Sequence, residues 1–288
     1  MYRILIVASI LSAVGARAEE PAPDKAPPPA PPPTAPPAVD APAPVEKTPL
    51  QEGDEILASK HDTKSFEHAV AIFQAELAKK PGDLDLSLKL CTSLNAVMRA
   101  KTQGNLALVN GTSDTPANKR IWSEHGKRSH ELCSAVQKAR PKDLETALQT
   151  AEAYMYLSSS MGIIQAVMSG AANQYKKNAD AILALDKTAD DDVGDIYHGA
   201  FYTVAPWPMN DVKKAREHFA KAAAIAPRSV RNRYYVGLGA FKDGDLVTAE
   251  REFTFARDNP CTTKSEIDFC AAIKAQAKLG LELIAKKK

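Results

Sequence analysis

The chain has 288 residues, of which 44% are hydrophobic and 25% are charged, as in a globular protein. It carries 37 Lys and Arg against 35 Asp and Glu; Arg3 and Arg17 lie within residues 1–18, which contain no acid, so 37 − 2 = 35 basic and 35 acidic residues remain beyond residue 18. A net charge of zero provides no general attraction to nucleic acid or to an anionic membrane, so we expect neither as a partner.

Residues 1–18 have the pattern of a secretory signal peptide. Arg3 precedes an uncharged apolar stretch from Ile4 to Gly15, and Ala16-Arg17-Ala18 fits a signal peptidase site. The stretch is about a dozen residues long, whereas a bilayer span needs about 20. We therefore expect cleavage after Ala18 and a periplasmic or secreted protein with no integral membrane span. An uncleaved N-terminal anchor is the alternative.

Residues 19–50 form a proline-rich segment that includes Pro27-Pro28-Pro29 and Pro31-Pro32-Pro33. It has few large apolar side chains and cannot bury enough surface to offset the entropy of ordering. The composition predicts a disordered, extended linker that either solubilises or tethers the rest of the chain.

The remaining residues, 51–288, are predicted to form one all-α repeat domain. They are rich in Ala, Leu, Lys and Glu, and the prolines Pro81, Pro141, Pro227 and Pro260 fall between segments of helical periodicity. Alternating β-branched runs, which would indicate strands, are almost absent. We expect roughly ten to twelve helices joined by short loops.

Large apolar residues are concentrated between residues 151 and 171, in a helical region interrupted by Gly162. A helix that is apolar on all sides normally belongs to the core. Methionine-rich surfaces also line adaptable binding grooves. Tyr154 and Met161 are therefore candidate ligand-binding residues, with plain core packing as the alternative interpretation.

A second apolar feature is the segment Ala205-Pro206-Trp207-Pro208-Met209, which follows a helix predicted from Asp195 to about Val204. It is an insertion in the expected turn and places Trp207 and Met209 on a loop, with Tyr202 just before it. Because loops often carry function, these three residues are candidate binding residues. The alternative is an apolar plug folded back on the helices.

One triad of residues occurs twice: Ala215, Phe219 and Ala222 recur as Ala249, Phe253 and Ala256, a shift of 34 residues. Spacings of four and seven place each triad on one face of a helix. A period of 34 is that of the tetratricopeptide repeat, a helix–turn–helix unit. The small alanines allow close helix approach, and each phenylalanine fills the space between units.

The flanking residues fit the same unit. Gly237 lies twelve residues before Ala249, and Gly244-Asp245 stands at the turn, with Asp245 as the expected N-cap. The chain resembles the tetratricopeptide repeat superfamily over about residues 195–260. A degenerate copy at about residues 65–100 contains Ala69 and Phe73. The resemblance implies an α-solenoid of stacked hairpins whose inner face binds a protein or peptide.

The order of elements is similar, more narrowly, to the periplasmic T component of TRAP transporters. An exported leader precedes degenerate helices, Trp122 lies ahead of an Ala/Tyr/Met-rich pair, and terminal hairpins complete the chain. The lipoprotein cysteine usual in that family is missing here. This resemblance implies a ligand-conducting or partner-docking role beside a substrate-binding protein, with a small apolar ligand as a further partner.

Four cysteines, an even number in an exported chain, predict two disulfides. Cys261 lies in a loop, and Cys270 falls one to two turns into a helix that Thr263 to Glu266 would open as a capping box. This spacing favours Cys261–Cys270 and leaves Cys91–Cys133, although three connectivities remain open. A metal site is the alternative, but no Cys-x-x-Cys pair occurs, so we expect neither metal nor cofactor.

Common catalytic motifs are missing from the sequence: there is no Gly-x-Ser-x-Gly, no phosphate-binding glycine loop and no His-Glu-x-x-His. We therefore predict a non-enzymatic exported scaffold that binds a protein or peptide partner in the cell envelope. The alternatives are a transport-associated ligand-binding protein resembling the T component, and an envelope hydrolase on a helical scaffold.

Overall fold

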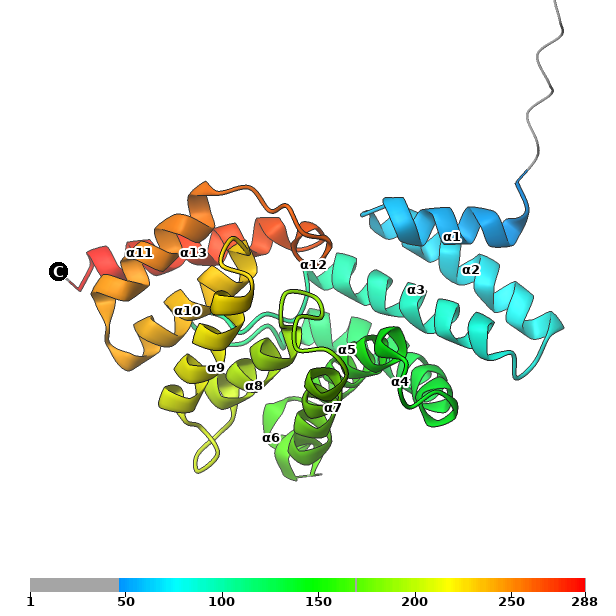
Figure 1. Ribbon diagram of the computed structural model, residues 1–288, viewed down its shortest axis with the longest axis horizontal. Helices are drawn as coiled ribbons and strands as arrows, with labels where there is room; N and C mark the ends of the chain where they lie inside the picture. Colours follow the sequence, from blue (N-terminus) through cyan, green and yellow to red (C-terminus); the bar gives the residue numbers. More distant parts are fainter. Residues whose placement is uncertain (1–46, 169, 288) are drawn as a thin grey trace, which may run out of the picture. The chain divides into compact units, whose positions relative to one another are not determined.

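Helices joined by short loops make up most of the structure. The computed structural model describes residues 47–168 and 170–287, so the predicted signal peptide and nearly all of the proline-rich segment lie outside it. In chain order the helices are α1 (Pro49–Ser59), α2 (Thr63–Lys79), α3 (Leu84–Thr102), α4 (Pro116–Ala139), α5 (Leu144–Ser160), α6 (Ile163–Met168), α7 (Ala171–Leu185), α8 (Val193–Val204), α9 (Val212–Ile225), α10 (Val230–Asp243), α11 (Leu246–Asp258), α12 (Lys264–Ile267) and α13 (Cys270–Ala285) (Figure 1).

Each long helix packs against the next long helix along the chain. The pairs run from α1 with α2 through α4 with α5, then α5 with α7, and onward to α11 with α13. Figure 1 shows these helices side by side in the order of the sequence. Within the described residues the only β pairing is the single bridge between Ala107 and Thr112. The predicted all-α fold of stacked helical hairpins is confirmed.

Side-chain caps define where most of these helices begin. The Asp245 carboxylate accepts a hydrogen bond from the Thr248 backbone and starts α11, as predicted. Gly244, with φ of 86°, ends α10 in the left-handed region that favours glycine. Aspartates occupy the same capping position at several other helix starts: Asp62, Asp83, Asp143, Asp192 and Asp211.

The repeat residues form the contacts between paired helices. Both Ala-Phe-Ala triads are fully buried. Phe219 of α9 packs so closely on Gly199 of α8 that an added Cβ would lie 2.3 Å from its ring. Phe253 of α11 packs in the same way on Gly237 of α10. Only glycine fits opposite the phenylalanine at these positions, which is why the repeat pairs these two residue types.

The degenerate copy uses the same contact. Phe73 of α2 is fully buried, and a Cβ on Gly53 of α1 would lie 2.6 Å from its ring. Twenty residues separate Gly53 from Phe73, as they do Gly199 from Phe219. The α1–α2 hairpin therefore has the internal packing of the later repeats.

Both disulfides have the pairing that the sequence favoured. Cys91–Cys133 joins α3 to α4, with 5.8 Å between the two Cα atoms. Cys261–Cys270 closes the loop that contains α12, with a Cα separation of 6.0 Å.

Two details of this last region differ from the prediction. Cys270 begins a separate helix, α13, instead of lying inside the helix opened at Thr263. The predicted capping box does not form, because Thr263 makes no side-chain cap hydrogen bond. The buried Glu266 carboxylate instead accepts hydrogen bonds from the Ser229 hydroxyl and the Arg231 backbone N–H, and so attaches α12 to the start of α10.

Within the described part of the chain, none of the helices is long and apolar enough to cross a membrane.

Candidate binding site

In the described part of the chain, a cavity with a volume of about 860 Å³ forms an open groove, here called the central groove. Its walls come from α1, α2, α3, α5, α7 and α8, with contributions from α10 and the α12 loop. The helices are held at this spacing by the glycine–phenylalanine contacts and by Cys91–Cys133. The groove has room for several residues of an extended peptide, and its volume also lies within the range of about 300–1,000 Å³ that small-molecule sites have.

Most charged side chains that line the groove form ion pairs with one another. Arg99 of α3 donates to both carboxylate oxygens of Glu152 of α5, at 2.8 and 2.9 Å, and to Asp268 at 2.7 Å. Burial disfavours charge on Arg99, but the adjacent carboxylates outweigh it and raise its pKa. Burial also raises the pKa of Glu152, with Arg99 opposing it. This cluster ties α3, α5 and the α12 loop together.

Three further pairs have the same character. Lys89 binds Asp54 at 2.6 Å, Arg140 binds Asp85 at 2.7 Å, and the nearly buried Arg231 binds Asp190 at 3.0 Å. Most of the charge around the groove is therefore compensated within ion pairs, and a lining of five Lys and Arg against seven Asp and Glu leaves only a small acidic excess.

Asp268 joins the two ends of the helical array. Its carboxylate lies 2.6 Å from the Nδ1 atom of His61, in the loop between α1 and α2, as well as contacting Arg99. Figure 1 shows α12 beside the end of α3. The loop closed by Cys261–Cys270 thus contributes Asp268 and Phe269 to the wall of the groove.

Tyrosines add aromatic surface to the floor. Tyr156, Tyr175, Tyr197 and Tyr235 all line the central groove. Burial raises the pKa of each of them, so all four phenols are neutral at physiological pH. Tyr156 and Tyr235 are buried in the core, whereas Tyr175 and Tyr197 are half-buried, and their neutral phenols can pack on a peptide and donate hydrogen bonds to its carbonyl groups.

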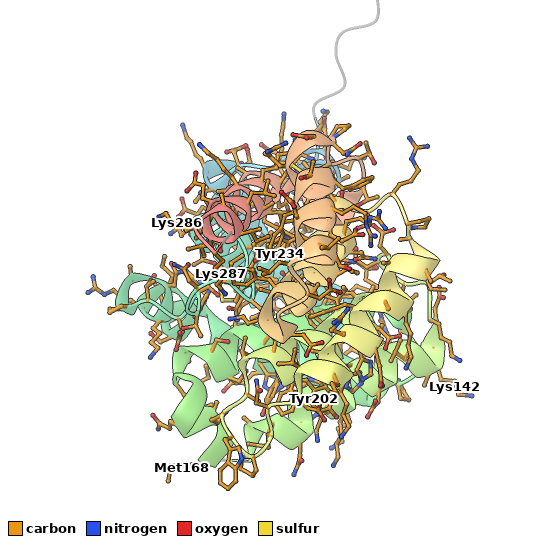
Figure 2. All side chains as sticks on the ribbon, turned by 90° about the vertical axis from the view of Figure 1, so that its left-hand side faces the viewer. Lys142, Met168, Tyr202, Tyr234, Lys286 and Lys287 are labelled. Carbon is orange, nitrogen blue, oxygen red and sulfur yellow. A yellow bond between two sulfur atoms is a disulfide. The ribbon has the colours of Figure 1, made fainter. Side chains whose placement is uncertain are left out.

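A chain segment far away in sequence fills the inner face of the C-terminal hairpins. Residues 104–112, the inner segment, connect α3 to α4 and run beside α10 (Figure 1). The Tyr234 hydroxyl donates to the Ala107 carbonyl at 2.7 Å, and the Val109 N–H donates to Gln276 Oε1 of α13 at 3.1 Å. Leu106, Ala107 and Val109 are buried in the same apolar cluster as Tyr234 and Ile273. Figure 2 shows Tyr234 enclosed by the packed helices.

A smaller pocket, the apolar chamber, lies between the inner segment and helices α5, α7 and α8, with a volume of about 120 Å³. Met155, Tyr175, Phe201 and Val204 supply its large apolar walls. The sequence had pointed to the methionine-rich helix of α5, and Met155 of that helix does face a cavity.

The five residues predicted to bind a ligand lie elsewhere. Trp207 is 88% exposed, so it does not form an apolar plug, and Met209 beside it is half-buried. The rings of Tyr202 and His218 are stacked with their centroids 5.8 Å apart, and the ring centroids of Tyr154 and His130 lie 5.1 Å apart. Met161 is half-buried at the end of α5. None of these five lines the central groove or the apolar chamber, and their binding role stays a prediction.

The residues that do line the groove include Arg99, Glu152, Arg231, Tyr235 and Asp268, which sequence reasoning did not single out. One signal was available for two of them. Once Gly237 fixes the register of the first helix of its repeat, Arg231 and Tyr235, four residues apart, lie together on another face of that helix. Among the described residues, no group of three or more His, Cys, Asp or Glu is arranged to hold a metal ion.

Comparisons with known proteins agree with this architecture. No protein-family profile and no curated protein matches the sequence. Among solved structures, a thermophilic TPR protein of Thermus thermophilus, TTC0263, is similar with a TM-score of 0.53 and 15% identity, over 80% of this chain and 97% of that one. Yeast Tom70 matches with a TM-score of 0.30 and 15% identity, over 78% of this chain and 62% of Tom70. The first of these likenesses confirms that the chain has the fold of a tetratricopeptide repeat protein.

Proposed function

We propose that this protein is a non-enzymatic, exported scaffold that binds an extended segment of a protein partner in its central groove. The observation that carries the proposal is the open, charge-compensated groove lined by neutral tyrosines. The groove-lining carboxylates of Glu152, Asp190 and Asp268 are engaged in ion pairs, an arrangement suited to binding more than to acid–base catalysis.

The inner segment supports the proposal because it shows how these hairpins hold extended backbone. Side chains on two helices, Tyr234 and Gln276, bind a carbonyl and an amide two residues apart, while apolar side chains are buried beside them. A partner segment in the central groove would be held by the same combination of side-chain hydrogen bonds and apolar contacts.

Export to the envelope rests on the predicted signal peptide and is supported by the two disulfides, which persist in oxidising compartments. An intact-mass measurement on protein from the envelope fraction tests it. The expected mass is that of residues 19–288 less four hydrogens. A mass that includes residues 1–18 would contradict cleavage.

Site-specific photo-crosslinking in the producing cell tests the scaffold. A photoreactive phenylalanine replaces Leu148, which lines the groove, in one variant, and Trp207 in a second. It replaces Val247, which is 80% exposed on α11 and outside both cavities, in a control. We expect a polypeptide adduct from position 148 and none from 247. Adducts from position 207 alone would move the site to the predicted loop, and adducts from none would contradict the scaffold.

A second candidate function, a transport-associated carrier like the T component of TRAP transporters, is favoured by the apolar chamber. That function requires a free small apolar ligand, which native mass spectrometry of gently purified protein would detect as an added mass.

A further inference from the structure

The apolar chamber has room for one ring-sized group. Small residues from three helices, including Ala172, Ala200 and Ser158, leave space between the larger side chains of Met155 and Phe201. The volume of about 120 Å³ is close to that of a dry apolar cavity of about 150 Å³ that binds benzene. A group the size of a leucine or phenylalanine side chain would fill the chamber.

The chamber lies beside the central groove. Five residues line both cavities: Asn105, Leu106, Met155, Tyr175 and Ala200. Two of them belong to the inner segment, one to α5, one to α7 and one to α8. The two cavities are therefore separated only by these elements, and a side group of a ligand in the groove would enter the chamber between them.

Several polar side chains around the chamber already have partners. Asn105 donates to the Ser159 hydroxyl at 2.6 Å and accepts from the Ser113 hydroxyl at 2.5 Å, and the Ser158 hydroxyl donates to the Met155 carbonyl at 3.0 Å. Asp114 accepts from the Thr112 hydroxyl and lies 3.6 Å from Lys119. A ligand group gains nothing there by being polar, because it would lose its own hydration without a free partner.

The groove itself offers little basis for selecting one peptide over another by charge, since its ion pairs compensate one another. Burial of a single large apolar side chain in a preformed pocket is the common way for such a surface to select a ligand and set its register.

We infer that the apolar chamber is an anchor pocket for one leucine- or phenylalanine-sized side chain of the extended peptide that binds in the central groove. This inference rests on the proposed function and adds to it the chemical class of the partner: an extended segment with one obligatory large apolar residue.

The first experiment tests the chamber without any peptide. Benzene is titrated into the full chain carrying ¹³C-methyl methionine, and the Met155 methyl resonance, assigned with Met155→Leu, is followed by NMR. We expect a saturable shift. Ala172→Leu, which fills the chamber, should abolish it. Ala181→Leu, a half-buried alanine on the same helix that lines neither cavity, should not. Absence of a shift in the unmodified protein would overturn the inference.

The second experiment selects ligands for the full chain from a displayed library of random decapeptides. We expect the selected peptides to share one Leu or Phe. Replacing that residue by Ala, or introducing Ala172→Leu, should each weaken binding about 10- to 100-fold, and the two changes together should weaken it no further. Ala181→Leu should leave the affinity unchanged, and the unfolding midpoints of both variants verify that they are folded.

Two outcomes separate this inference from the proposed function. If peptides are selected but bind Ala172→Leu as tightly as the unmodified chain, the anchor pocket is wrong and the peptide scaffold stands. If benzene binds but no peptide is selected, the scaffold and the anchor are both overturned, and the chamber is a site for a free small apolar molecule.

Discussion

The first and second halves of the helical array are built from the same hairpins but differ in what lies against their inner face. Helices α1, α2, α3 and α5 border the open central groove together with α7 and α8, and charged side chains pair across the helices there. Helices α10 to α13 instead enclose the inner segment, whose Leu106 and Val109 belong to their apolar core. One half has a surface available to a partner, and the other has its own chain in that position.

The repeat pattern accounts for how the helices pack into hairpins, but it does not account for whether the inner face of a hairpin is open. Glycine–phenylalanine contacts recur in both halves and account for the hairpins. Whether a hairpin face is free to bind depends on a loop more than a hundred residues away, which carries no repeat signature. Four measurements test whether the two halves differ in this way.

The largest effect is expected at the repeat phenylalanines. Phe253→Ala and, in the other half, Phe73→Ala remove fully buried rings packed on glycine, and each should lower the free energy of unfolding by about 3–5 kcal/mol. Urea denaturation followed by circular dichroism measures the loss. A loss below about 1 kcal/mol in either variant would show that its half does not depend on the repeat contact.

The next largest effect is expected on removal of the disulfides, which should destabilise the two halves by different amounts. Cys91–Cys133 closes a loop of 42 residues and Cys261–Cys270 a loop of nine. Chain entropy predicts a loss of about 4 kcal/mol for the first double Cys→Ala variant and about 3 kcal/mol for the second. Urea denaturation of both variants in oxidising buffer checks the order. The reverse order would mean that the α12 loop supports more of the fold than its length implies.

The Tyr234→Phe substitution tests only the half whose inner face is occupied by the inner segment. The Ala107 carbonyl, which is buried, loses its donor, so we expect a loss of about 1–2 kcal/mol and faster amide exchange at Val109. Hydrogen exchange with mass spectrometry resolves the segment. Tyr202→Phe, at a half-buried ring outside the segment, should change stability by less than about 0.5 kcal/mol. Unchanged exchange at Val109 would show that the inner segment does not depend on this hydrogen bond.

The smallest expected effect is on the pH dependence of stability and arises at the start of α8, between the two halves. Burial, and then the charge of Asp195, raise the pKa of Asp192 to about 7. The folded protein binds this proton more tightly than the unfolded chain does, so stability falls as the pH rises from about 4 to about 7. Asp192→Asn keeps a cap and should gain roughly 1–2 kcal/mol at pH 8, with no gain at pH 4.

Asp211 provides the matched control with the opposite sign. A hydrogen bond from the Lys214 backbone lowers the pKa of this exposed cap, so Asp211→Asn should lose stability at pH 8 and not at pH 3. Thermal unfolding of both variants across this pH range makes the comparison. A parallel pH response of the two variants would contradict the assignment at Asp192.

Spacing along the chain was sufficient to predict the class of helices and the register of the repeats, because helical periodicity makes that spacing visible without any tertiary information. It favoured the two disulfide pairings that the structure has but left three connectivities open. The triad at Ala249, Phe253 and Ala256 is buried as its 34-residue shift predicted.

Which helix faces are open and which side chains meet could not be predicted from the sequence, because both depend on the tertiary structure. Arg99, Glu152 and Asp268 come from three separate elements, and their ion pairs depend on how the hairpins stack along the whole array. Trp207 and Met209, which are conspicuous in the sequence, lie on a loop away from both cavities. Local periodicity specifies the side of each helix that faces its neighbour. The relative placement of distant hairpins depends instead on many packing contacts together, and this placement forms the groove.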